Sequence, residues 1–493
     1  MNAMNWLVVY PEIVLLAMAC VVTVVDLWVT DPARRVTLWL TQGTMLCVGA
    51  MHLFYAQSGA TLYGMNGMVV TDPMGHLLAA FACGAMVITV AYAQPYLASR
   101  DMLKGEFFTL SLFVLLGISV MCSANHFLVV YLGLEVMSLS LYALTALRRD
   151  HGRSTEAAMK YFVLGALASG FLLYGLSMLY GATGSLEIPK VFEQIAAGRI
   201  NREVLVLGVV FVVSGLAFKL GAVPFHMWVP DVYHGAPTAV TLMIGGAPKL
   251  AAFAITIRLL VEGLHGLAVD WQQMFIVLAV ASLAVGNLAA IAQRNLKRML
   301  AYSTIAQMGF LLLGLSAGVV SGNTLSAANA YSSAMFYIVT YVLTTLGTFG
   351  LIMFLSREGF ESEEVSDLAG LARRRPWLAG VMSVFMFSLA GIPPMVGFFA
   401  KLAVIQALVT TNVTLYVVLA VVAVVFSLVG AFYYLRVVKV MYFDEPADTT
   451  PIVQGAGVGA LLALNGAAVL LLGPFSGGLL GLCRDAIVKA LAS

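Results

Sequence analysis

The stretch GLAFKLGAVPFHMWVPDVYHGAPTAVTLMIGGAPKLAAF, from Gly215 to Phe253, decides the fold. It lies among long apolar segments, yet it holds two lysines, two histidines, an aspartate and four prolines. Proline removes a backbone donor and glycine weakens a helix, so Gly221-Ala-Val-Pro224 predicts an interrupted helix. Inside a bilayer, such a break is tolerated only where it faces protein or water. The stretch therefore predicts a polar site within a membrane protein.

The composition of the whole chain supports this interpretation. Of 493 residues, 61% are hydrophobic and 10% are charged, and the mean hydropathy is +0.96. A helix needs about 20 apolar residues to cross a bilayer, and the pattern predicts an all-α, multi-pass protein of about 14 transmembrane helices. The predicted spans lie near residues 7–29, 36–56, 74–94, 107–124, 126–147, 157–180, 203–230, 238–260, 272–292, 299–318, 329–355, 378–409, 414–442 and 455–480.

The breaks between these spans are too short for a water-soluble domain, and the longest polar one runs from Ser356 to Pro376. Any chemistry in water must therefore come from a partner. The first apolar segment is too long and too weakly flanked by positive charge for a cleaved signal peptide. No basic run interleaved with aromatic residues predicts binding to nucleic acid. The five cysteines are scattered, and we interpret them as small buried residues.

Positive charge predicts the orientation, because lysine and arginine are retained on the cytoplasmic side. One set of alternate loops holds sixteen of the 26 positive residues, Lys297 among them, and the opposite set holds six, including Arg199 and Arg258. Both termini are therefore expected outside the cytoplasm. The remaining four positive residues are lysines that fall within predicted helices.

An internal repeat relates the two halves of the chain. Gly221-Ala-Val-Pro224 matches Gly391-Ile-Pro-Pro394 at an offset of 170 residues, which is five predicted spans. An odd number of spans reverses direction, so the two copies are predicted to be inverted repeats that place a transport site near the midplane. The predicted division is residues 1–106 as a three-helix region, 107–260 as the first five-helix repeat (spans four to eight), 261–443 as the second (spans nine to thirteen), and 444–493 as the last helix and tail.

Five charged residues fall within the predicted spans: Glu135, Lys160, Lys219, Lys249 and Lys401. Each costs roughly 2.5 to 3.5 kcal/mol at the centre of a bilayer, so such residues usually serve function. Lysine can lose its proton when it is desolvated. A buried row of lysines can therefore take and pass protons, with the Glu135–Lys219 pair as a switch and Lys249 and Lys401 as the conduit.

Each of these residues also has a structural alternative. Lys160 could extend its stem to the cytoplasmic surface, and Glu135 could form an ion pair that only fixes helix packing. His226 is a further candidate for the relay, but a histidine near a helix break can equally be a hydrogen-bonded filler. Asp231 is expected to end its helix and cap the next one. The GAGVGA sequence from Gly455 follows no strand, so we do not interpret it as a dinucleotide site.

Four segments resemble a known family: KLGAVPFHMWVPDVYHGAPTAVT, EAAMKYFVLGALASG, GNLAAIAQRNLKRMLAYSTIAQMGF and SLAGIPPMVGFFAKL. They are similar to the antiporter-like subunits of the proton-pumping NADH:quinone oxidoreductase, respiratory complex I. The resemblance covers roughly residues 11–443. The Pro-Asp-Val-Tyr form is typical of one of three sister subunits, since the other two read Pro-Asp-Ala-His there. The family's glutamate and four lysines correspond to Glu135, Lys160, Lys219, Lys249 and Lys401, and all five are present.

The resemblance implies a subunit of a proton-translocating enzyme in a bacterial inner membrane. It places no redox centre or other cofactor in this chain, and it implies NADH, flavin, iron-sulfur clusters and quinone in partner subunits. The implied partners are other membrane subunits and the lipid bilayer. Two alternatives stay open: a subunit of a multi-subunit sodium/proton antiporter, and a structural membrane-arm subunit without a proton channel of its own.

Overall fold

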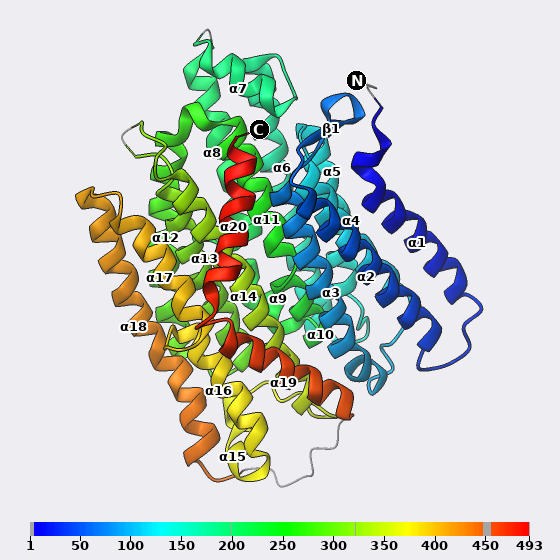
Figure 1. Cartoon of the computed structure of the whole chain (residues 1–493). Helices are drawn as coiled ribbons and strands as arrows, with labels where there is room; N and C mark the ends of the chain where they lie inside the picture. Colours follow the sequence, from blue (N-terminus) through cyan, green and yellow to red (C-terminus); the bar gives the residue numbers. More distant parts are fainter. Residues whose placement is uncertain (1–3, 199, 321, 447–454, 493) are drawn as a thin grey trace.

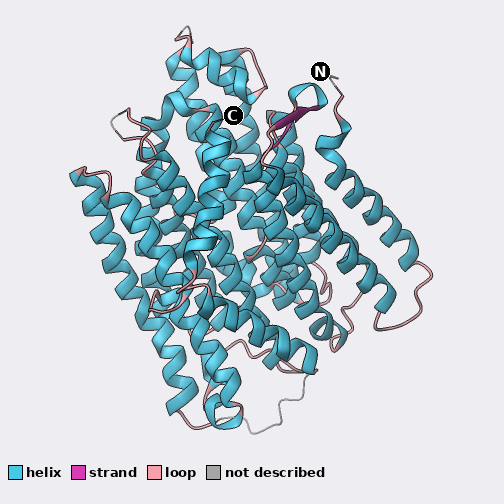
Figure 2. Ribbon diagram, in the orientation of Figure 1, coloured by secondary structure: helices cyan, strands magenta, loops and turns pink. Residues whose placement is uncertain are grey.

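The computed structural model describes residues 4–198, 200–320, 322–446 and 455–492, and these are almost entirely helical (Figure 2). The helices are α1 (Tyr10–Asp26), α2 (Arg35–Ser58), α3 (Pro73–Ala98), α4 (Gly105–Ser123), α5 (Phe127–Thr145), α6 (Gly152–Thr183), α7 (Ile188–Ala196), α8 (Arg202–Leu220), α9 (Trp228–Gly235), α10 (Thr238–Gly245), α11 (Pro248–Thr256), α12 (Ala268–Ala292), α13 (Leu296–Ser316), α14 (Ala327–Leu355), α15 (Leu371–Arg374), α16 (Pro376–Ala390), α17 (Val396–Val409), α18 (Thr414–Phe443), α19 (Ala456–Leu471) and α20 (Ser476–Leu491). Short 3-10 turns lie at Trp6–Val9, Met65–Gly67, His265–Leu267 and Val365–Leu368, and a π-helix, η3, at Ile257–Gly263.

The predicted membrane architecture is confirmed. Eleven of the described helices are long and apolar enough to cross a bilayer. The bent pair α19 and α20, the broken pair α16 and α17, and the more polar α2 complete the fourteen predicted segments. The element order also repeats: α4, α5, α6, α8–α9 and α10–α11 are followed by α12, α13, α14, α16–α17 and α18. Each five-span unit therefore holds its predicted broken helix, α8–α9 or α16–α17, as its fourth span.

The two ends of the bundle differ in structure. A small antiparallel hairpin, β1 (Leu62–Gly64) with β2 (Val69–Thr71), lies at the end that also holds α7 and both ends of the described chain (Figure 1). The sequence analysis predicted neither the hairpin nor α7. At the opposite end, the loop with α15 connects α14 to α16. This end is called the loop end below, and the other is called the termini end.

The last predicted span is not a single helix. The chain turns by 82° between α19 and α20, around the break at residues 472–475. The bent pair packs against α14, which belongs to the second repeat, and against α3, which belongs to the N-terminal helices. It therefore contacts both regions. The prediction of a single helix over 455–480 is therefore wrong, because two helices at an angle replace it. The second of them, α20, continues to Leu491.

The eighth predicted span is also interrupted. Gly245 ends α10, and Pro248 begins α11, because proline suits the first turn of a helix but not its interior. Lys249 falls near the middle of the predicted span 238–260, and in the structure it lies in the first turn of α11. Residues 238–261 of this span are all buried. The interruption is therefore covered by protein, as a break inside a bilayer requires.

Candidate functional site

The two predicted broken helices end in the same way. Gly221 after α8 and Gly391 after α16 have φ angles of 82° and 84°, a left-handed conformation that suits glycine. The amide of Gly221 donates to the carbonyl of Ala217 at 2.8 Å, and that of Gly391 to Phe387 at 3.0 Å. These repeat-related ends confirm the match that the sequence predicts.

Proline leaves the last carbonyls of each half-helix without helical partners. In α16 the amides that would reach the last two carbonyls belong to Pro393 and Pro394, which carry no N–H. After α8, Pro224 lacks the N–H and the amide of Val223 donates to Ser282 instead, at 2.9 Å. Each break therefore presents two carbonyl oxygens, with the partial negative charge of a helix C-terminus, to whatever donor lies nearby.

Lys249 supplies the donor at the first break. Its Nζ donates to the carbonyls of Lys219, at 3.1 Å, and Leu220, at 2.8 Å. The side chain is 1% exposed, and its ammonium lies 5.6 Å from the ring centre of Trp228. A buried ammonium is therefore held against the backbone from which the Lys219 side chain emerges.

Lys401 does the same at the second break. Its Nζ donates to the carbonyls of Leu389 at 2.9 Å and Ala390 at 3.0 Å, and to Ser427 Oγ at 2.9 Å. Leu389 and Ala390 are the repeat equivalents, at the offset of 170, of the two residues that Lys249 contacts. The two lysines thus occupy equivalent positions in space, although Lys249 belongs to the following span and Lys401 to the broken span itself.

Among the described residues, no ion pair or hydrogen bond joins Glu135 to Lys219. Lys219 Nζ donates to Ser138 Oγ at 2.8 Å, and Ser138 lies one turn after Glu135 on α5. Glu135 Oε1 is buried and has no hydrogen-bond partner among the described residues. The Glu135–Lys219 switch therefore stays a prediction.

Lys160 lies at the loop end of α6 and is 42% exposed. Its Nζ contacts Glu156 and Asp231, each at 2.8 Å, and Asp231 also pairs with Arg298 at 2.8 Å. The helix α9 continues past Asp231 to Gly235, so the expectation that this aspartate ends its helix is wrong. Asp231 instead joins α6, α9 and α13 through its two cationic partners.

His226 lies in the break between α8 and α9, where its carbonyl accepts a hydrogen bond from Val229 N at 2.9 Å. None of the described ion pairs includes it. A role for His226 in the relay stays a prediction.

A polar network that the sequence analysis missed continues from Lys401. Gln307 on α13 donates to the carbonyl of Leu389 at 3.1 Å and to the hydroxyl of Tyr434 at 3.0 Å, and Tyr337 donates to its side-chain oxygen. A cavity of about 20 Å³ opens between these residues and Lys401. Uncharged amides and hydroxyls carry no hydropathy signal strong enough to single them out, and only their convergence in space identifies them.

Two residues that were assigned to loops are buried instead. Lys297 is 1% exposed and donates to the carbonyl of Ala236 at 2.8 Å. Arg258 is also 1% exposed and contacts Asp72 at 2.7 Å and Glu262 at 2.8 Å. Each of the two alternate sets of loops thereby loses one positive residue. The excess of lysine and arginine therefore stays on the same side. Arg199, in the smaller set, lies outside the described residues.

A polar cavity of about 260 Å³ opens at the loop end, between α6, α9 and the loop after α14, and Lys297 lines its floor. Glu361 projects into it and accepts hydrogen bonds from Arg100 Nε at 2.9 Å and from the Tyr96 hydroxyl at 2.8 Å. Burial raises the pKa of Glu361, but these bonds and the nearby positive charge outweigh it and hold that pKa below its ordinary value. The cavity therefore keeps a negative charge beside Lys297.

Two inverted five-span units, each with a broken helix capped by a buried lysine, define the class of antiporter-like membrane proteins. The model of the NADH:quinone oxidoreductase/Mrp antiporter family matches residues 124–427. The chain belongs to this family. The match covers most of both predicted repeats and begins after α3.

Curated relatives extend the likeness to the whole chain. The protein called NADH-quinone oxidoreductase subunit N in Polaromonas naphthalenivorans is 62% identical over 489 residues, which are 99% of this chain and 98% of that protein. The protein of the same name in Herminiimonas arsenicoxydans is 60% identical over 497 residues, with 100% of each chain covered. Subunit N is also the sister subunit that the Pro-Asp-Val-Tyr form indicates, so the predicted resemblance is confirmed.

Solved structures share the fold. A chain of respiratory complex I from Thermus thermophilus with bound aureothin matches at a TM-score of 0.80 and 30% identity, over 97% of this chain and 100% of that one. A chain of the Mrp complex from Dietzia sp. matches at a TM-score of 0.83 and 21% identity, over 100% and 99%. The second likeness concerns the fold alone. Within the described residues, no group of three or more histidine, cysteine, aspartate or glutamate side chains could hold a metal ion.

Proposed function

We propose that this chain is a proton-translocating membrane subunit, of the N type, of a bacterial NADH-quinone oxidoreductase. The observation that carries the proposal is the pair of buried lysines, Lys249 and Lys401, each held on the two free carbonyls of a broken helix. Electrons pass from NADH to quinone in partner subunits, which hold the flavin and the iron-sulfur clusters. This chain supplies the proton path, and no cofactor is required in it.

In the proposed path, protons enter from the loop end, where Lys160, Asp231 and the polar cavity lie. Lys219 exchanges its proton across Ser138 according to the charge on Glu135, because a nearby carboxylate stabilises the ammonium form. The proton passes next to Lys249, whose ammonium already contacts the backbone of Lys219. A deprotonated lysine keeps a lone pair at Nζ, so it can take a proton from one side and release it toward the other.

The path then reaches Lys401 and leaves toward the termini end. The hydroxyls and the amide around Gln307 provide donors and acceptors between helices α13, α14 and α18. We propose the divisions 107–260 and 261–443 as the two functional repeats, with 1–106 and 444–493 as their flanking regions. The family match over 124–427 lies within the two repeats.

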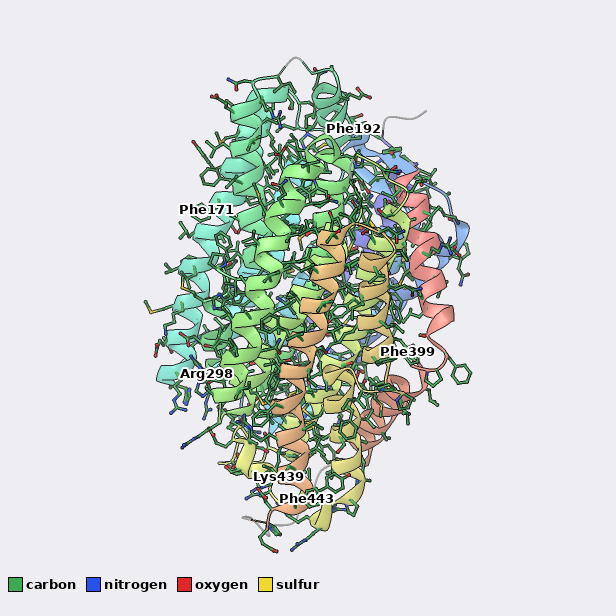
Figure 3. The ribbon with its side chains drawn as sticks, turned by 90° about the vertical axis from the view of Figure 1, so that its left-hand side faces the viewer. Phe171, Phe192, Arg298, Phe399, Lys439 and Phe443 are labelled. Carbon is green, nitrogen blue, oxygen red and sulfur yellow. The ribbon has the colours of Figure 1, made fainter. Side chains whose placement is uncertain are left out.

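The proposed orientation places the loop end in the cytoplasm and the termini end outside it. It rests on the excess of positive residues at the loop end. Figure 3 agrees with the assignment of loops to ends, since Arg298 and Lys439 lie toward one end of the bundle and Phe192 of α7 lies at the other. The chain's multi-pass insertion in a bacterial membrane follows from its family and its helices.

Two other functions stay possible within the fold. The Mrp-type antiporter alternative is named in the description of the matching family and shares the fold at 21% identity, while the relatives at 62% and 60% are both subunits of NADH-quinone oxidoreductase. Purification of the chain in mild detergent with its companions distinguishes the two, because flavin and iron-sulfur absorbance is expected only for the oxidoreductase. A purely structural subunit is distinguished by the variants below.

The proposed function is tested with Glu135→Ala and Lys219→Ala in the intact complex. Each removes a group that sets the charge around Ser138, so proton pumping and quinone-coupled NADH oxidation should fall together, while Glu135→Asp keeps much of both. The yield of assembled complex is measured first. If either alanine variant assembles normally and pumps at the wild-type ratio of protons to electrons, the switch is not at this pair.

A further inference from the structure

A second chain of titratable side chains lies outside the lysine relay, near the termini end of α1, α2, α3 and α4. His76 Nδ1 lies 3.0 Å from His52 Nδ1, and His52 Nε2 lies 3.1 Å from Ser119 Oγ. Ser119 Oγ donates to Glu12 Oε1 at 2.9 Å. All four side chains are buried. Each comes from a different helix, so the contacts cross the bundle rather than follow one helix.

Hydrogen-bond chemistry fixes the direction of this chain. The Ser119 hydroxyl donates to Glu12, so its oxygen accepts from His52, which must carry its proton on Nε2. The Nδ1 of a neutral His52 is then a lone pair, and His76 must donate to it from its own Nδ1. Each donor therefore points from His76 toward Glu12.

A balanced transfer follows from this arrangement. A proton bound at Nε2 of His76 releases the Nδ1 proton of His76 to His52, the Nε2 proton of His52 to Ser119, and the hydroxyl proton of Ser119 to Glu12. Three protons each move across one hydrogen bond, and the net change is one proton gained by the carboxylate. Glu12 Oε2 is buried and without a hydrogen-bond partner among the described residues. A charged carboxylate is costly in such a place, so delivery of a proton relieves that cost.

The hydrogen-bonded series begins at His76, which is buried in the first turn of α3. His76 follows Asp72 by one turn of α3, and Asp72 bonds Arg258 in η3. A cavity of about 10 Å³, near the minimum for one water, is lined by His76, Asp72 and Glu12. Arg258 and Glu262 in turn line a cleft of about 540 Å³ between α7, the start of α14 and the end of α20. Polar groups therefore connect the cleft to His76.

We propose that Glu12 is a proton-binding site, separate from the lysine relay, that exchanges protons with the compartment at the termini end through Ser119, His52 and His76. Glu12, His52 and His76 lie on the N-terminal helices and Ser119 lies on α4, the first span of the first predicted repeat; all four precede the family match, which begins at residue 124. The other titratable or charged groups around it are Tyr55 on α2, Asp72 and Cys83 on α3, Cys122 on α4, and Arg258 and Glu262 in η3.

The test is exchange of the Glu12 proton for deuterium, followed by infrared spectroscopy on the intact, reconstituted complex. The carboxylic acid band that is present in wild type and missing in Glu12→Gln reports the protonated Glu12. This band should shift promptly on transfer to D₂O in wild type. In Ser119→Ala, which removes the link between His52 and Glu12 and leaves Ser123 Oγ at 3.3 Å from Glu12 Oε1, exchange should slow by about tenfold or more. His52→Gln should slow it too, because an amide can hold both hydrogen bonds but cannot pass a proton between them.

Ser111→Ala is the matched control. Ser111 is buried on the same helix, but its hydroxyl bonds only the carbonyl of Phe107, at 2.6 Å, so exchange should stay at the wild-type rate. The proposal is overturned if no band depends on Glu12 at any pH, or if an assembled Ser119→Ala or His52→Gln complex exchanges as fast as wild type. It is also overturned if Ser111→Ala slows exchange as much as they do. Variants of Glu135 and Lys219 test the lysine relay separately, so either proposal can fail alone.

Discussion

Replacing each of the two capping lysines by methionine separates a structural role from proton transfer. Methionine keeps an unbranched apolar stem and removes the ammonium. At the second break both carbonyls keep another donor, because Gln307 Nε2 reaches Leu389 O at 3.1 Å and Ser427 Oγ reaches Ala390 O at 3.2 Å. Lys401→Met therefore leaves neither carbonyl unpaired.

At the first break the described residues offer no second donor to the carbonyls of Lys219 and Leu220. A buried polar group left without a partner costs about 1 to 3 kcal/mol, so Lys249→Met should cost roughly 2 to 6 kcal/mol for its two carbonyls. Both substitutions also remove the cost of burying a charge, and that term is of similar size at the two sites. The two variants are therefore expected to differ by the cost of the two unpaired carbonyls at the first break.

The assay is the yield and thermal stability of the assembled complex, followed by NADH-driven pumping. We expect Lys401→Met to assemble close to wild type and to fail in pumping, while Lys249→Met loses both assembly and pumping. A Lys249→Met complex as stable as the Lys401→Met complex would show that carbonyl capping does not hold the first break. A fully pumping Lys401→Met complex would remove Lys401 from the proton path.

Gly391→Ala should reduce pumping, since alanine at a φ of 84° costs about 1 to 2 kcal/mol and its Cβ would lie 2.9 Å from Lys401 Cδ. Gly380→Ala, on the same α16 with no atom within 4 Å of an added Cβ, is the control and should pump normally; equal losses in both would point to α16 as a whole. For orientation, a reporter inserted after Arg153 should be cytoplasmic and one inserted after Lys190 should not, because α6 lies between them. Reporters on the same side would contradict that crossing.

The sequence predicted the membrane architecture because hydropathy over about 20 residues is a strong signal. It missed the structure of short polar segments, such as the hairpin at Leu62–Gly64 and α7, where propensity is weak and packing decides. It also misjudged two helices at their glycines and prolines: the interruption before Lys249 and the bend of 82° between α19 and α20. Local composition permits a break at such points, and neighbouring helices determine whether the break forms.

The charged residues of the site were predictable because charge is rare and costly in a bilayer. The hydrogen-bond partners of these residues could not be predicted from the sequence. Ser138 accepts the hydrogen bond of Lys219, and Gln307 joins the Lys401 region only through folding. Arg258 was misplaced in a loop because its two carboxylate partners, one of them 186 residues away, supply the compensation that the sequence does not reveal.

The two repeats share a backbone feature, a helix that ends in two unpaired carbonyls, and not a set of charged residues. At the offset of 170 the carbonyls capped by Lys249 and by Lys401 coincide, but Lys249 itself corresponds to Leu419 and Glu135 to Ile305. In each half, glycine and proline interrupt a helix, and a lysine donates to the two unpaired carbonyls. The lysine comes from a different position in each repeat. Two unpaired carbonyls in an apolar interior need a hydrogen-bond donor, and the long, flexible side chain of lysine can reach them from more than one span. At the same offset Glu135 and Lys219 correspond to the uncharged residues Ile305 and Leu389. This difference supports the proposed single path through both breaks rather than two identical channels.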